Sequence, residues 1–276
     1  MKEDNAVLFD SHTHTAFSFD GSPDATPRAM CEAALRAGLS GIALTDHFEV
    51  NNVKEQIYEP FQADNAFAAA TEAKKEFEGR LHVSCGIELG QAAEYPEEAR
   101  AFLAKHKYDF VLASTHNLPM VPDFYFFRFE IIPDPMIDNL FLRALDETEK
   151  LCDFDGIHAL AHLTYMHRYV AYANRTLDFS KHKEHFEAIF RKMVRKDLAL
   201  EINVSLLRRG RDLLMPTREL IELYIENGGA LFTVGSDAHT LSDVGANISD
   251  AYELLRALSV PNVAFYENGR PSLIPI

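Results

Sequence analysis

Short apolar runs alternate along the chain with longer segments of helical periodicity. The runs expected to form strands are 7–10, 41–45, 81–87, 110–114, 156–161, 199–203 and 230–234, with a short final strand at 263–266. The segments expected to form helices are 27–35, 60–78, 96–106, 135–150, 180–196, 217–227 and 250–258. This alternation is typical of parallel strands joined by crossover helices. It predicts an α/β fold in one domain, a parallel TIM-like barrel that is incomplete or distorted because seven clear units are present instead of eight.

Each main strand ends in polar residues, most of which can bind a metal ion. These residues are His12, His14, Asp46, His47, Glu88, His116, His162, Glu201, Asn203, Asp237 and His239. The C-terminal ends of the strands of a parallel barrel meet on one face, so the side chains are expected to converge. Together they supply enough imidazole and carboxylate for two or three divalent cations.

The composition of this pocket indicates its chemistry. In His12-Thr13-His14, side chains two residues apart on an extended strand point the same way, so both imidazoles can bind one cation. Imidazole with carboxylate suits zinc, iron or manganese, and the lack of a thiolate argues against a purely structural zinc site. Adjacent cations generate hydroxide at neutral pH and hold phosphoryl oxygens, which favours phosphate monoester hydrolysis. The residues alone leave amide or ester hydrolysis open.

The remaining histidines are expected to have other roles. His158, four residues before His162 on one strand, is predicted to be a hydrogen-bonded core residue deeper in the barrel. His182 and His185 lie among charged residues at a helix start, which predicts a solvated face. His167 follows the fifth strand and is a further candidate for the site, although a structural role is favoured.

Charge and cysteine content limit the classes of partner. The formal net charge of -15 disfavours a nucleic-acid groove, because phosphate backbones are bound by clustered Lys and Arg. Neither a signal peptide nor a membrane span is visible, and the three cysteines form no CxxC pair. We therefore expect a cytoplasmic protein that acts on a small molecule; its oligomeric state is left open.

Six motifs in order resemble the polymerase-and-histidinol-phosphatase (PHP) superfamily. They are HTHT, TDH, GIELG, STHN, the histidine of ALAHLTY, and GSDAH, spanning residues 10 to about 245. The longer pieces FSFDG, HLTYMHRY, EINVS and GSDAHTLSDVG resemble its histidinol-phosphate phosphatase branch. The resemblance implies a PHP metal-dependent phosphoesterase domain over 1–276, folded as a distorted TIM-like (β/α)7 barrel.

The resemblance also implies how a trinuclear centre is divided. One metal would be held by His12, His14, Glu88 and Asp237. A second would be held by Glu88, His116 and His162, and the third by Asp20, His47 and His239.

Three further residues are candidates for catalytic roles. Arg168 and Arg208 could bind the phosphate, because their planar forks match its oxygens, or could instead make surface ion pairs. Asp46 could orient a ligand, which we favour, or give a proton to the leaving alcohol.

The function implied is hydrolysis of L-histidinol phosphate to L-histidinol and phosphate, a step of histidine biosynthesis, by metal-activated hydroxide. One alternative keeps the chemistry but takes another small phosphate ester or phosphotyrosine. It is motivated by the aromatic, proline-containing segment 117–133, which is too apolar for a disordered linker. The other alternative is a non-catalytic metal-binding module.

Overall fold

The computed structural model describes residues 7–55, 58–211 and 213–276. Its centre is a parallel sheet in which the spatial order of the main strands follows their order along the chain. These strands are β1 (Phe9–Thr13), β2 (Gly41–Leu44), β4 (His82–Gly90), β5 (Phe110–Ser114), β6 (Ala159–Leu160), β7 (Ala199–Asn203) and β8 (Phe232–Gly235). The short β3 (His47–Glu49) pairs with β4 beside this path.

The sheet curves until its first strand meets the segment after its last. Asp237 N donates to the carbonyl of His12 and His14 N donates to that of Ala238, each at 2.8 Å. The predicted distorted barrel is confirmed as a nearly closed parallel barrel of seven strands within the described residues. The residues that close the ring are thus also residues predicted to bind metal.

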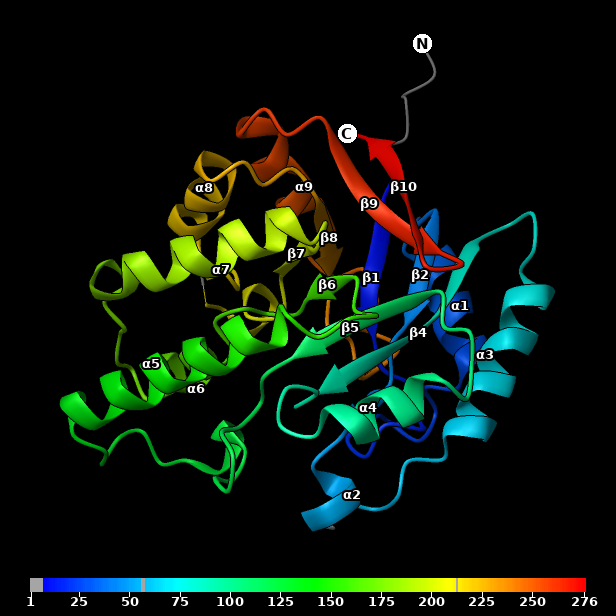
Figure 1. The fold of residues 1–276 in the computed structure, drawn as a ribbon. Helices are drawn as coiled ribbons and strands as arrows, with labels where there is room; N and C mark the ends of the chain where they lie inside the picture. Colours follow the sequence, from blue (N-terminus) through cyan, green and yellow to red (C-terminus); the bar gives the residue numbers. More distant parts are fainter. Residues whose placement is uncertain (1–6, 56–57, 212) are drawn as a thin grey trace.

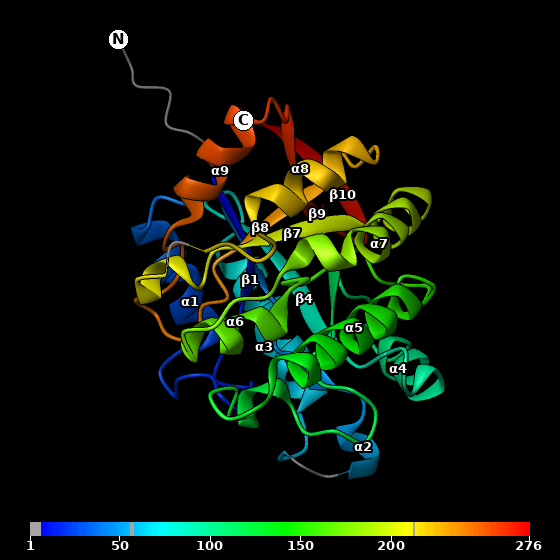
Figure 2. The same ribbon diagram turned by 90° about the vertical axis from the view of Figure 1, so that its left-hand side faces the viewer.

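Helices surround the strands in both views (Figures 1 and 2). They are α1 (Pro27–Arg36), α2 (Asn52–Glu55), α3 (Ala63–Glu76), α4 (Pro96–Leu103), α5 (Asp134–Leu151), α6 (Tyr165–Tyr172), α7 (Lys183–Arg195), α8 (Arg218–Glu226) and α9 (Ile248–Ala257). Three 3-10 turns accompany them: η1 (Phe124–Phe126), η2 (Phe179–His182) and η3 (Leu207–Arg209). Within the described ranges, none of these helices combines the length and apolarity that crossing a membrane requires.

A hairpin of β9 (Asn262–Glu267) and β10 (Arg270–Pro275) lies across the N-terminal end of the barrel (Figure 1). The ring of Phe265 packs 4.5 Å from that of Phe9, at the start of β1, and Tyr266 packs 4.9 Å from Phe110, at the start of β5. The prediction for His158 is confirmed here: its Nδ1 accepts a hydrogen bond from Val111 N at 2.9 Å. Apolar side chains therefore fill this end, and the polar residues lie at the other.

Candidate metal centre

The nine predicted ligands converge at the C-terminal ends of the barrel strands. They are His12, His14, Asp20, His47, Glu88, His116, His162, Asp237 and His239. They come from β1, β3, β4 and from the loops that follow β1, β5, β6 and β8. Parallel strands end on the same side of a barrel, and this is what brings together residues far apart in the chain.

The first group contains His12, His14, Glu88 and Asp237. His12 Nε2 and His14 Nε2 lie 2.9 Å apart. His14 Nε2 lies 3.5 Å from both Glu88 Oε2 and Asp237 Oδ1. Two imidazole nitrogens and two carboxylate oxygens facing a common point make a donor set that fits one divalent cation.

The second group lies on the other side of the same glutamate. Glu88 Oε1 lies 2.9 Å from His162 Nε2 and 3.1 Å from His116 Nε2, and these two nitrogens are 3.4 Å apart. Since Oε2 faces the first group and Oε1 the second, the carboxylate of Glu88 lies between two cation-sized donor sets.

The third group is His47, His239 and Asp20. His239 Nε2 lies 3.1 Å from Asp20 Oδ2, and His47 Nε2 lies 3.7 Å from Asp20 Oδ1. The ring of His14 stacks between the other two imidazoles, 4.2 Å from His47 and 4.1 Å from His239. The side chain of Asp20 is 43% exposed, so this group opens toward solvent.

Unmatched donor atoms and charges also fit cation binding. His239 Nε2 is buried and makes no hydrogen bond with a described residue despite its short distance to Asp20, so its lone pair is directed elsewhere. Burial would raise the pKa of Glu88, but the imidazoles of His47, His12 and His116 hold it well below its usual range. Burial opposes protonation of His116, yet Glu49 and Glu88 raise its pKa to about 10. The buried carboxylates around His116 therefore favour positive charge at this part of the site.

Two carboxylates outside the nine assigned ligands hold the imidazoles of the site. Glu201 Oε1 lies 2.6 Å from His12 Nδ1, and Glu49 Oε1 lies 2.8 Å from His116 Nδ1. Ionised carboxylates only accept hydrogen bonds, so each Nδ1 carries a proton and Nε2 is the ring nitrogen available to a metal, which would displace any proton there. Glu201 was noted as a strand-end residue, whereas Glu49 was missed.

Two features of the sequence could have indicated Glu49. It lies two residues after His47, so on an extended strand both side chains point to the same side. It also pairs in register with Gly90, and a Cβ at position 90 would collide with the Glu49 carboxylate. The glycine that ends GIELG therefore makes room for a buried acid.

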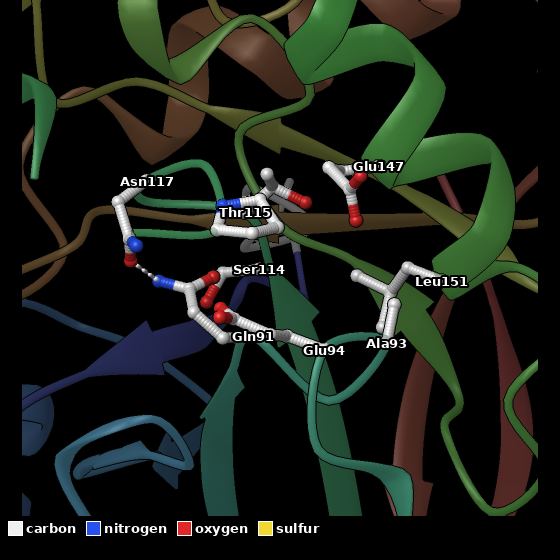
Figure 3. Close-up of a pocket in the computed structure, with 9 residues that line it drawn as sticks. Gln91, Ala93, Glu94, Ser114, Thr115, Asn117, Glu147 and Leu151 are labelled. Atoms are coloured by element: carbon white, nitrogen blue, oxygen red, sulfur yellow. Dashed lines mark hydrogen bonds between the residues drawn. The ribbon is translucent and has the colours of Figure 1, made fainter. Parts of the chain in front are cut away.

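A network of amides fixes Glu49 from behind. Gln91 Nε2 donates to Glu49 Oε2 at 3.0 Å and to Asn117 Oδ1 at 2.5 Å, and Gln91 Oε1 accepts from His116 N at 3.2 Å. Figure 3 shows Gln91 and Asn117 beside a small cavity of about 10 Å³, with Glu94 at its edge. Glu49 is thus held at both ends, by an amide and by a metal-site imidazole.

Replacing Glu49 by glutamine is expected to weaken metal binding by about 10- to 100-fold, because the amide no longer fixes the tautomer of His116. Titration of the metal-free protein with zinc against a competing chelator measures this effect. Glu94→Gln is the matched control, since Glu94 lines the same cavity without contacting an imidazole. Equal zinc affinities for the two variants would contradict the positioning role.

Asp46 lies behind the first group instead of in the open pocket. Its carboxylate accepts hydrogen bonds from Thr15 N at 2.6 Å, Thr15 Oγ1 at 2.8 Å and Ser18 Oγ at 2.7 Å. Ser18 Oγ lies 3.2 Å from His14 Nδ1. These contacts favour the orienting role over proton donation to a leaving group, and the role stays a prediction.

The two candidate arginines have different surroundings. Arg168 donates to Asp237 Oδ2 at 2.5 Å and to Ser205 Oγ at 2.9 Å, and it lines the pocket above the ligands. Arg208 donates to the backbone carbonyls of Ser236 and Asp237. Arg168 is therefore placed to meet an oxyanion, whereas Arg208 supports the backbone that carries Asp237; both catalytic roles stay predictions.

The backbone at two ligands is unusual. Asp237 has φ 55° and His162 has φ 22°, in the left-handed region that residues other than glycine rarely adopt. Such conformations concentrate at functional sites, where the surrounding structure holds them. At Gly235, a Cβ would collide with His12 and Glu201, so only glycine lets β8 approach β1 this closely.

Two histidines lie away from the centre. His167 is buried on α6 against the ring of Phe179, and burial lowers its pKa to about 4. The prediction of a solvated face is wrong for His182, which is buried with its Nε2 3.0 Å from Asp138 Oδ1. Its ring packs against Phe141, and this contact between helices cannot be read from the local charge pattern.

An open pocket of about 760 Å³ lies above the metal ligands. Segment 117–133 forms one wall through Asp123 and the aromatic residues that follow it, and α6 forms another. Opposite them, Phe19 stacks on Tyr58 at 4.1 Å and on His47 at 5.0 Å. The ligand groups therefore lie at the floor of a pocket large enough for a small organic molecule.

A parallel barrel with three donor groups at the C-terminal ends of its strands defines the class of barrels with a polynuclear metal centre. The family model described as PHP domain matches residues 10–205. The chain belongs to the PHP domain family.

Curated relatives match over nearly the whole chain. A probable histidinol-phosphatase of Clostridium acetobutylicum is 25% identical over 94% of this chain and 97% of its own length. The histidinol-phosphatase of Lactococcus lactis is 26% identical over 93% of each chain.

Two solved structures share the fold. That of the histidinol phosphate phosphatase of Lactococcus lactis, complexed with zinc, L-histidinol and phosphate, matches with a TM-score of 0.80. Its identity is 23%, and the match covers 96% of this chain and 98% of that chain. The structure of a protein of Listeria monocytogenes described as a putative histidinol phosphatase matches with a TM-score of 0.75 at 19% identity, covering 88% of this chain and 99% of that chain.

Proposed function

We propose that this protein is a metal-dependent phosphomonoesterase that hydrolyses L-histidinol phosphate to L-histidinol and phosphate. The observation that carries the proposal is the convergence of nine side chains able to bind metals at the floor of one pocket, where overlapping sets of them have the spacing of ligands to one ion. The full-length similarity to histidinol-phosphatases supports the choice of substrate. The three cysteines are free and buried, which supports a reducing cytoplasm as the location.

The residues present fit divalent cations, which when bound would supply positive charge and a nucleophile at neutral pH. Glu88 lies between two donor groups and so fixes their spacing. Glu49 and Glu201 hold protons on Nδ1 of His116 and His12, so that Nε2 is the nitrogen each ring turns toward a cation. Arg168, beside Asp237, is placed to orient phosphoryl oxygens, because its fork can donate two parallel hydrogen bonds.

A substrate panel tests the assignment. Protein loaded with zinc, manganese or iron is expected to release phosphate from L-histidinol phosphate with a kcat/KM at least about 100-fold above that for sugar phosphates, nucleotides and phosphotyrosine peptides. Comparable rates on all of them would refute the substrate.

The same panel addresses the other candidate functions. Preference for phosphotyrosine would favour the alternative motivated by segment 117–133, in which Tyr125 and Phe126 are exposed at the pocket. Bound metal without turnover of any ester would indicate a non-catalytic metal-binding module.

A further inference from the structure

The alcohol part of a phosphate ester bound at the metal centre must extend into the pocket above it. One carboxylate of that pocket, Asp123, lies beside the second ligand group. Phe124 N donates to the carbonyl of His116 at 3.1 Å, which fixes the segment to the strand that supplies this ligand. Tyr165 donates its hydroxyl to Asp123 Oδ1 at 3.2 Å, while its ring packs 4.6 Å from His116 and 4.9 Å from His162. Asp123 is thus one tyrosine ring away from two metal-site imidazoles.

Only one of the two carboxylate oxygens of Asp123 accepts hydrogen bonds from described residues. Both of its hydrogen bonds are accepted by Oδ1, from Tyr165 and from Tyr125 N at 2.7 Å. These two hydrogen bonds favour the ionised form, but burial outweighs them and raises the pKa of Asp123, so a cationic partner would stabilise the charged carboxylate. Among the described residues, Oδ2 accepts no hydrogen bond and no Lys or Arg pairs with Asp123, although it is half-buried and lines the pocket. A partly desolvated carboxylate without a cationic partner is suited to binding one from solution.

Tyrosine rings surround this carboxylate. The rings of Tyr165 and Tyr169 lie 5.2 Å apart, and Tyr169 lies 6.0 Å from both Tyr125 and Tyr172. All four line the pocket. Aromatic faces attract cations through the ring quadrupole, and a carboxylate among aromatic rings is a typical setting for an ammonium group.

Charged side chains of opposite sign lie on either side of the Tyr165 ring. Arg168 lies over the other face of the same region, with its guanidinium 5.2 Å from the centre of the Tyr165 ring and its Nη2 on Asp237. The hydroxyl of Tyr165 donates to Asp123, and the guanidinium of Arg168 lies over its ring. Arg168 therefore supplies positive charge beside the metal ligands, while Asp123 and Glu130 supply negative charge at segment 117–133; Arg209, over the ring of Tyr172, also lines the pocket.

We propose that Asp123 is a specificity-determining residue that binds an ammonium group on the leaving alcohol, so that the site selects zwitterionic phosphate monoesters. This inference rests on the proposed phosphatase function and names the substrate class that the same site takes. L-Histidinol phosphate has the required chemistry, because its amine is on the carbon next to the esterified CH₂ group. Asp123 fixes the amine while the part of the pocket beside Arg168 receives the phosphate.

Two esters that differ only in the amine test the inference. These are L-histidinol phosphate and 3-(imidazol-4-yl)propyl phosphate, and the measured quantity is the ratio of their kcat/KM values. Asp123→Asn keeps the oxygen that accepts both hydrogen bonds and replaces Oδ2 by an NH₂ group, so the segment should stay folded while its charge is lost. The ratio is expected to fall about 10- to 100-fold, as for loss of a hydrogen bond between charged groups. Glu130→Gln, which removes an equal charge from the same pocket, is expected to change the ratio by less than about 3-fold.

A second measurement separates this inference from the proposed function. Calorimetric binding of L-histidinol to the metal-loaded protein requires no turnover and should weaken by the same factor in Asp123→Asn, with metal content unchanged. An unchanged ratio and unchanged binding would overturn the role of Asp123 even if both esters are hydrolysed. If the wild type hydrolyses neither ester, the proposed substrate fails, and the comparison of phosphoethanolamine with propyl phosphate gives the same test. An equal effect of Glu130→Gln would show that only the net charge of the pocket matters and would also overturn the role.

Discussion

Glu88→Gln is expected to reduce kcat/KM for phosphate release by at least about 1,000-fold and to lower the bound metal. The carboxylate of Glu88 faces two donor groups at once, with one oxygen 3.5 Å from His14 Nε2 and the other 2.9 Å from His162 Nε2. An amide presents one oxygen and one NH₂ group, so it cannot serve both groups. Steady-state kinetics and elemental analysis of the purified variant measure the two effects.

The substitution conserves volume, so its effects can be separated from misfolding by thermal unfolding. Glu97→Gln, on the exposed surface of α4, is the control and should keep full activity and metal content. Retention of full metal content together with near-normal activity in Glu88→Gln would show that Glu88 does not lie between two cations.

Arg168→Ala is expected to lower kcat/KM by about 100- to 1,000-fold, the usual effect of removing one preorganised donor to a developing oxyanion. Arg168→Lys should recover only part of this loss, because the ammonium keeps the charge but not the planar fork. Inhibition by inorganic phosphate should weaken in parallel, since the same group contacts the product. Initial rates and phosphate inhibition constants provide the measurements.

Metal content distinguishes two roles of this arginine. If Arg168 acts on phosphate, elemental analysis of Arg168→Ala should give wild-type metal, whereas a role limited to holding Asp237 would appear as lost metal with unchanged phosphate inhibition. Arg191→Ala removes an exposed arginine paired with Glu187 and is the matched control. Its kinetics should match those of the wild type.

The strand-end ligands were predictable because two local rules act together. Alternation along a strand fixes which side chains share a face, and parallel strands end on one side of the barrel. For His12 and His14 the spacing alone is enough, and the structure places their nitrogens 2.9 Å apart. The helix at 27–35 was similarly fixed by its cap, since Thr26 Oγ1 accepts from Ala29 N at 3.2 Å and α1 begins at Pro27.

Other features depend on contacts between distant segments. Glu49 lies on a strand of only three residues and meets His116 from 67 positions away, so its spacing from His47 indicates the face it shares but not its contact with His116. Helix α6 was missed because polar and apolar residues alike occupy the buried positions of Tyr165–Tyr172, and the rest are half-buried, which hides its periodicity. Strand β10 was missed because Pro271 and Pro275 disfavour a strand, yet prolines are tolerated at an edge.

The contact between β1 and the segment after β8 links the site to the whole chain. Asp237 N and the carbonyl of His12 form one of its hydrogen bonds, and the side chains of the same two residues belong to one donor group. A cation bound there would join β1 to the segment after β8, where the ring of strands closes. Because the crossover units all lie between these two residues in the chain, the cation would bind the closed ring more tightly than the unfolded chain and should stabilise the barrel against unfolding.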